Sequence, residues 1–143
     1  MAPSKLMAMP AKIRVVIVDD HQVIRTSWKI LFGTDPRFEV VAVFKSGQEA
    51  IDLLPATAAD VVLMDINMFP VNGFDATSQL VKIVPAIRII GISANNYPGY
   101  AQKMMSLGAR GFVTKSSPFE ELTRAVAMIH EGETYVCDEI TRM

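Results

Sequence analysis

The chain has 143 residues, half of them hydrophobic, which is enough to bury one core. Its formal net charge is −1 and no basic run is present, so the composition gives no sign of nucleic-acid binding. A single cysteine excludes an internal disulfide and a cysteine metal cluster. With neither an apolar run of membrane-spanning length nor a signal-peptide core, the sequence predicts a cytoplasmic protein with no membrane partner.

The first half of the chain alternates strand patterns with helix patterns. The elements expected there are, in order, a flexible leader over residues 1–11, a strand over 13–18, a helix over 21–32, a strand over 38–44, a helix from about 46 to 54, and a strand over 61–65. Gly33 ends the first helix. Ser46 and Glu49 form a capping box that opens the second.

The second half continues the alternation. It predicts a helix over residues 73–84, a strand over 87–92, a helix over 98–107, a strand over 111–114 and a helix from about 118 to 131. Ser117 is expected to cap the last helix, whose apolar stripe recurs at helical spacing. Strands that alternate with helices predict a parallel sheet covered on both faces. Right-handed crossovers then favour the flavodoxin-like (βα)5 α/β fold, doubly wound, with strand order 2-1-3-4-5.

Several of these strands end in residues that can carry chemistry. The residues at the strand ends are Asp19, Asp20, Asp65, Ser93 and Lys115. Asp65 alone could merely cap the following turn. The expected strand order, however, makes the first and third strands neighbours and brings all these side chains to one edge, at the switch point where such sheets bind ligands.

The grouping of three carboxylates predicts a metal-dependent phosphoryl-transfer site. Carboxylates this close repel one another unless a cation neutralises them. Oxygen ligands favour Mg²⁺ or Mn²⁺ over zinc. A divalent ion beside a carboxylate, a hydroxyl and an ammonium indicates phosphoryl transfer, with the carboxylate as nucleophile.

At these residues the chain resembles the receiver domains of two-component response regulators, over residues 12–132. The resemblance rests on Val-Asp-Asp-His at 18–21, Asp65-Ile-Asn-Met with Gly73 eight residues after the aspartate, Ser93-Ala94, Lys115 twenty-two residues after Ser93, and an aromatic residue, Phe112. Each match alone is weak. Together, in order and at these spacings, they are specific.

The resemblance implies a role for each matched residue. Asp65 is expected to accept a phosphoryl group from a histidine kinase, and Ser93 and Lys115 to contact the phosphoryl oxygens. For the metal, it implies direct binding by Asp20, Asp65 and the Asn67 main-chain carbonyl, and binding by Asp19 through water. Such a domain is not an enzyme, beyond self-phosphorylation from small donors and autodephosphorylation.

The expected output is a conformational switch at Ser93 and Phe112. Movement of Ser93 toward the phosphoryl group would make room for Phe112 to turn inward. The surface expected to change comprises the helix over 98–107, the strand over 111–114 and the helix that follows.

The segments Gly108–Pro118 and Glu131–Val136 resemble one subgroup, in which a helix-turn-helix DNA-binding domain follows the receiver. The resemblance implies that residues 133–143 begin a linker toward such a domain, that DNA is bound only through it to control transcription, and that phosphorylation promotes a homodimer. The alternative is a stand-alone receiver that acts by protein–protein interaction.

The chain departs from the family pattern in the loop after the phosphoacceptor, and three other classes of protein fit the sequence less well. The family usually has proline four residues after the phosphoacceptor, whereas this chain has Phe69 there and Pro70 next, so the loop can run differently. A flavodoxin needs a phosphate cradle where Asp19 and Asp20 stand. An aspartate-nucleophile phosphohydrolase needs an Asp-x-Asp pair on one strand. A degenerate receiver is disfavoured because every acidic, hydroxyl and lysine position is filled.

Overall fold

The computed structural model describes residues 11–142. The expected leader over residues 1–11 lies outside them, except for Ala11. The elements are β1 (Ile13–Val18), α2 (Gln22–Gly33), β2 (Phe38–Phe44), α3 (Gly47–Leu53), the 3-10 helix η1 (Leu54–Ala56), β3 (Val61–Asp65), α4 (Gly73–Ile83), β4 (Arg88–Ser93), α5 (Pro98–Ser106), β5 (Gly111–Thr114), α6 (Phe119–His130), β6 (Tyr135–Val136) and α7 (Asp138–Thr141).

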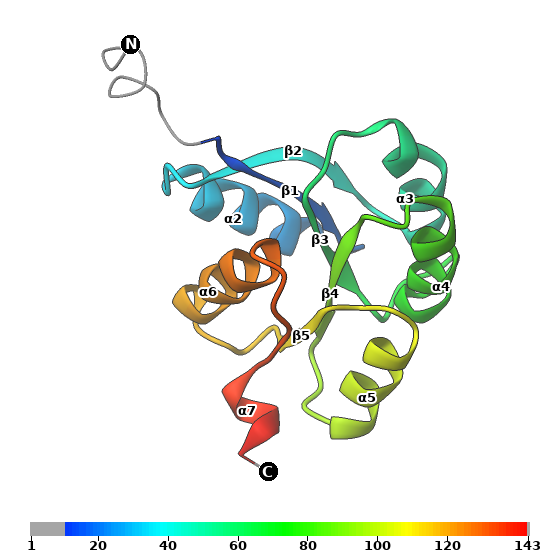
Figure 1. Ribbon diagram of the computed structural model, residues 1–143, viewed down its shortest axis with the longest axis vertical. Helices are drawn as coiled ribbons and strands as arrows, with labels where there is room; N and C mark the ends of the chain where they lie inside the picture. Colours follow the sequence, from blue (N-terminus) through cyan, green and yellow to red (C-terminus); the bar gives the residue numbers. More distant parts are fainter. Residues whose placement is uncertain (1–10, 143) are drawn as a thin grey trace.

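The strands form one parallel sheet in the order β2-β1-β3-β4-β5-β6. Helices α2 and α6 cover one face of the sheet, and α3, α4 and α5 cover the other (Figure 1). The flavodoxin-like order 2-1-3-4-5 is confirmed. The prediction of five strands was incomplete, because β6 adds a sixth at the outer edge of β5. A two-residue strand is too short to produce a periodic sequence pattern.

Of the two serines expected to cap helices, only one does so. Ser46 caps α3 as expected, since its hydroxyl accepts a hydrogen bond from the Glu49 N–H at 3.1 Å. The predicted cap of α6 was wrong: the N-cap is Pro118, and Ser117 instead shares a 2.8 Å hydrogen bond with the Thr114 hydroxyl. Tertiary contact at the end of β5 thus competes with helix capping for the serine.

The core lies between the sheet and its helices and consists mainly of strand residues. All five residues of β3 are buried, as expected for a central parallel strand. Within residues 11–142, none of the helices has the length and hydrophobicity needed to cross a membrane.

Candidate functional site

The carboxyl ends of β1 and β3 bring two buried carboxylates together. Val18 pairs with Met64 in the parallel register, so Asp19 and Asp65, the next residues on each chain segment, lie at the same level. Only 1% of Asp19 and 2% of Asp65 is exposed. Asp20 follows on the exposed side, and its side chain is 38% accessible. The predicted convergence of the three acids is therefore observed.

Lys115 lies between the two buried acids. Its Nζ is 2.9 Å from Asp19 Oδ2 and 3.5 Å from Asp65 Oδ2. The lysine is held there because its backbone N–H donates to the Ser93 carbonyl at 2.7 Å. Ser93 is fully buried at the end of β4, and its hydroxyl accepts a hydrogen bond from the Asn95 N–H at 2.9 Å. The ammonium and the hydroxyl thus come from neighbouring strands at the same edge.

The environment of Asp65 disfavours its ionised form. Burial raises the pKa of Asp65 to about 6, and the nearby negative charge of Asp19 adds to this effect. Lys115 acts in the opposite direction without cancelling it. A carboxylate with a raised pKa beside a second buried acid is typical of a functional site.

The donor set fits a hard divalent cation. Asp19, Asp20, His21 and Asp65 each offer one ligand atom, and these atoms lie within 4.8 Å of one another. Asp19 Oδ2 is buried and accepts no well-aligned hydrogen bond from the described residues, although Lys115 neutralises its charge. An oxygen-rich cluster with one under-satisfied buried oxygen suits Mg²⁺ or Mn²⁺.

Two residues of the site were missed by the sequence reasoning. His21 Nδ1 lies 2.8 Å from Asp19 Oδ1 and 3.0 Å from Asp20 Oδ1. Arg25 donates to the Asp19 carbonyl at 2.8 Å. The signal for His21 was its place directly after the acidic pair. The signal for Arg25 was its spacing, since one helical turn after His21 puts both on the same side of α2.

The loop after β3 carries the departure from the family pattern. Phe69 is 87% exposed, the Phe69–Pro70 peptide bond is cis, and Val71 has a left-handed φ of 64°. Asn67 lies on this loop, and its N–H donates to Asp65 Oδ1 at 3.2 Å. At Gly73 a side chain would collide with the Asp65 carbonyl, which explains the glycine eight residues after the aspartate.

Phe112 already lies inside the domain. It is fully buried, and it pairs across the sheet with Gly91 on β4. A Cβ atom at Gly91 would be 2.7 Å from Phe112 Cδ1 and 3.0 Å from Met104 Cε, so the missing side chain of Gly91 makes room for the ring. The ring of Phe112 therefore already occupies the inward position that it was expected to reach only after phosphorylation.

Strand β6 partly covers the surface of α5, β5 and α6, which was expected to change on phosphorylation. Strand β6 pairs with the outer edge of β5, which would otherwise be the open centre of that surface. Helix α7 follows beyond the end of β5 (Figure 1). The surface of α5, β5 and α6 is therefore interrupted by the chain's own C-terminal residues.

Comparison with protein families gives the class to which this site belongs. The family model described as the response regulator receiver domain matches residues 15–127. This chain belongs to the response regulator receiver domain family. It is a signalling domain of two-component systems rather than a classical enzyme, and domains of this family receive their phosphoryl groups from histidine kinases and generally bind Mg²⁺.

Two of the proteins that the chain resembles are named as transcriptional regulatory proteins. The chain is 35% identical to the transcriptional regulatory protein DegU of Brevibacillus brevis over 130 residues, 91% of this chain and 55% of DegU. It is 34% identical to the transcriptional regulatory protein UhpA of Escherichia coli, with 90% and 64% covered. The chain thus spans roughly 55–64% of the length of these curated relatives.

Solved structures of response regulators have the same fold as this chain. A LuxR-family two-component response regulator from Aurantimonas sp. SI85-9A1 superposes with a TM-score of 0.88 at 31% identity, covering 92% of this chain and 94% of that one. The NarL receiver domain of Mycobacterium tuberculosis superposes with a TM-score of 0.80 at 28% identity, covering 87% and 100%.

Proposed function

We propose that Asp65 is the phosphoacceptor of this receiver domain and takes its phosphoryl group from a histidine kinase in a Mg²⁺-dependent reaction. The observation that carries the proposal is the buried Asp65 carboxylate, flanked by Asp19 and by the Lys115 ammonium. Transfer forms a bond between an Asp65 oxygen and phosphorus, while the phosphorus–nitrogen bond of the kinase phosphohistidine breaks and its electron pair stays on the imidazole.

The chain's own groups account for binding and orientation of the phosphoryl group. Lys115 can follow the growing negative charge on the phosphoryl oxygens, because its ammonium already lies 3.5 Å from Asp65. Ser93 is the last residue of the neighbouring strand β4, and its hydroxyl can donate to the same phosphoryl oxygens. The acidic pair, Asp65 and the Asn67 carbonyl would hold Mg²⁺, whose chemistry when bound is neutralisation of clustered negative charge.

The wider role proposed here is control of transcription in the cytoplasm. The names of DegU and UhpA describe transcriptional regulatory proteins longer than this chain. In that setting, phosphorylation of this domain would act on a DNA-binding domain that follows it, and would promote pairing with a second copy. The full chain has a formal net charge of −1, and its sequence contains no run of basic residues that would attract DNA.

The test is phosphorylation with acetyl phosphate in the presence of Mg²⁺. The wild-type protein should gain one phosphoryl group, and peptide mapping should locate it at Asp65. Asp65→Asn should abolish labelling, whereas the exposed Asp52→Asn on α3 should leave it unchanged. A label on any residue other than Asp65 in the wild-type protein would refute the assignment.

A further inference from the structure

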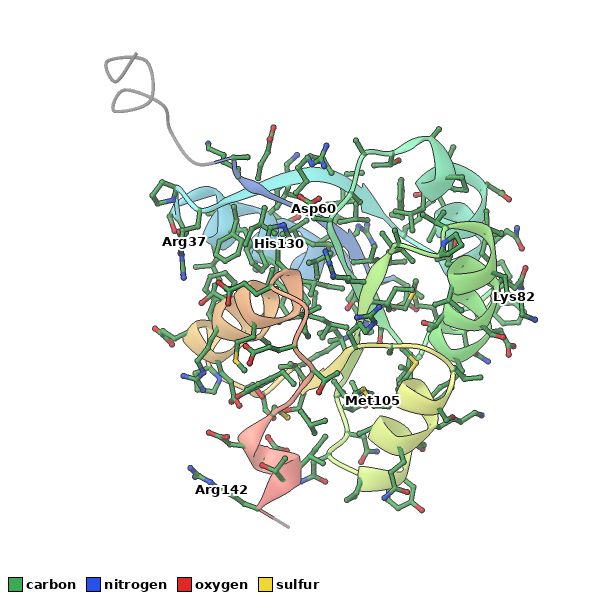
Figure 2. The ribbon with its side chains drawn as sticks, in the orientation of Figure 1. Arg37, Asp60, Lys82, Met105, His130 and Arg142 are labelled. Carbon is green, nitrogen blue, oxygen red and sulfur yellow. The ribbon has the colours of Figure 1, made fainter. Side chains whose placement is uncertain are left out.

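The C-terminal tail, residues 133–142, is attached to the domain along the edge of β5. The Tyr135 N–H donates to the Arg110 carbonyl at 3.1 Å, and the Cys137 N–H donates to the Phe112 carbonyl at 3.0 Å. Figure 2 shows Arg142 at the end of this tail, on the opposite end of the domain from Arg37. Two carboxylates hold the tail in place. Glu121 belongs to α6 and binds tail residues, whereas Glu139 belongs to the tail and binds residues at the end of β5.

The first carboxylate is a buried anchor on α6. Glu121 is only 7% exposed, and its Oε2 accepts hydrogen bonds from the Tyr135 hydroxyl and, at 2.7 Å, from the Asp138 N–H. Arg124 donates to the same Tyr135 oxygen at 3.2 Å. A buried carboxylate is tolerated only when it is hydrogen-bonded in this way, so the tail satisfies Glu121 as much as Glu121 holds the tail.

The second carboxylate connects the tail to the loop that carries Lys115. Glu139 Oε1 accepts hydrogen bonds from the Ser116 hydroxyl at 2.6 Å and from the Thr114 hydroxyl at 3.1 Å. The hydrogen bond from Ser116, and to a smaller extent that from Thr114, lowers the pKa of Glu139, because a hydroxyl that donates to a carboxylate stabilises its ionised form. Ser116 directly follows Lys115. The tail is therefore hydrogen-bonded to the residue next to the proposed phosphoryl-contacting lysine.

We propose that the tail is a latch on the edge of β5 that phosphorylation at Asp65 opens, through Lys115, Ser116 and Glu139. The proposal rests on the proposed function of Asp65. Lys115 is now closer to Asp19, at 2.9 Å, than to Asp65, at 3.5 Å. A phosphoryl group on Asp65 adds negative charge and acceptors that attract the ammonium away from Asp19.

The latch lies one residue from Lys115, so a shift of the Lys115 backbone that accompanies the movement of its ammonium is transmitted to the latch. Ser116 is covalently adjacent, and its 2.6 Å hydrogen bond to Glu139 tolerates little displacement. Loss of this bond leaves α7, a helix of four residues, held by the weaker Thr114–Glu139 hydrogen bond, by the Asp138 N–H on Glu121 and by the burial of Ile140. Short elements with few contacts open at low free-energy cost. Opening uncovers the edge of β5 with which β6 pairs.

The chain contains its own reporter of this opening. Cys137 is the single cysteine of the sequence, lies between β6 and α7, and is fully buried. A buried thiol is inert, so its reaction with a thiol reagent such as DTNB measures how often the tail opens.

The experiment measures the rate of Cys137 labelling with and without beryllofluoride and Mg²⁺, while ¹⁹F NMR records beryllofluoride binding in the same samples. Beryllofluoride should accelerate labelling of the wild-type protein. Glu139→Ala should accelerate it about three- to tenfold without beryllofluoride, the loss expected for an exposed charged hydrogen bond, and should gain little more when beryllofluoride is added. Ser116→Ala should behave in the same way.

Two variants control for general loosening of the tail. Glu139→Gln keeps a carbonyl acceptor for Ser116 and should remain close to wild type. Glu133→Ala removes a carboxylate of the same tail that makes no hydrogen bond with the described residues, and should not change the rate. Far-UV circular dichroism establishes that each variant is folded.

Failure of the latch is distinguishable from failure of the phosphoacceptor assignment. Bound beryllofluoride with an unchanged labelling rate would overturn the latch and leave the role of Asp65 intact. Absence of beryllofluoride binding would overturn the proposed function, and with it the coupling. Labelling of Glu139→Ala at the wild-type rate would show that this contact does not hold the tail.

Discussion

The raised pKa of Asp65 predicts that the proposed phosphoacceptor destabilises its own domain. The folded protein keeps the proton on Asp65 up to about pH 6, whereas the unfolded chain loses it near the ordinary value of 3.8. The contribution of Asp65 to the free energy of unfolding should therefore fall as pH rises from about 4 to about 6 in metal-free protein, because the folded state binds more protons at this residue over that range. Asp65→Asn, which cannot ionise, should remove this dependence.

The magnitude follows from the two pKa values. The difference between 3.8 and about 6, at about 1.4 kcal/mol per pKa unit, corresponds to a ceiling of about 3 kcal/mol. Solvent screening at the mouth of the site lowers this, so we expect Asp65→Asn to raise the free energy of unfolding at pH 7 by about 2 kcal/mol. At pH 3.5 the difference between variant and wild type should largely disappear.

Urea denaturation in EDTA at the two pH values measures both quantities. The exposed Asp52→Asn is the matched control and should change stability by less than about 0.5 kcal/mol at either pH. Magnesium added to the wild-type protein should restore stability at pH 7, since it neutralises the same charge. A variant that is destabilised at pH 7, or stabilised equally at both pH values, would refute the account of Asp65.

Three further predictions follow from packing and charge. Phe112→Ala should cost about 3–5 kcal/mol in urea denaturation, because the ring is fully buried, whereas Phe69→Ala should cost less than about 0.5 kcal/mol; equal losses would contradict the observed burial. Gly91→Ala should cost about 1–3 kcal/mol through its clash with Phe112, and clearly less in a Phe112→Ala background, so an unchanged cost there would rule out the clash. In a magnesium titration Asp20→Ala should weaken binding more than Asp19→Ala, whose carboxylate is already paired with a lysine; equal losses would disprove that ranking.

Much of the site could be predicted from sequence because it depends on where strands end. A run of apolar residues closed by Asp65 or Lys115 places that side chain at the carboxyl edge, once the parallel order is known. The contribution of His21 could not be predicted in the same way. Its ring contacts Asp19 through a local turn whose geometry the sequence pattern does not specify.

The sequence by itself determined the alternation of strands and helices, their order in the sheet and the meeting of Asp19 with Asp65. These follow from short-range periodicity and from the handedness of crossovers, which are local or general properties of chains. Only the tertiary structure decided that the tail pairs with β5 and that Glu121 and Glu139 hold it. Strand β6 has two residues and no periodic pattern, and a glutamate on a helix has the same sequence signature whether it faces solvent or a buried hydroxyl. The hydrogen-bond partners of Glu121 and Glu139 are determined by packing between segments that are distant in the sequence.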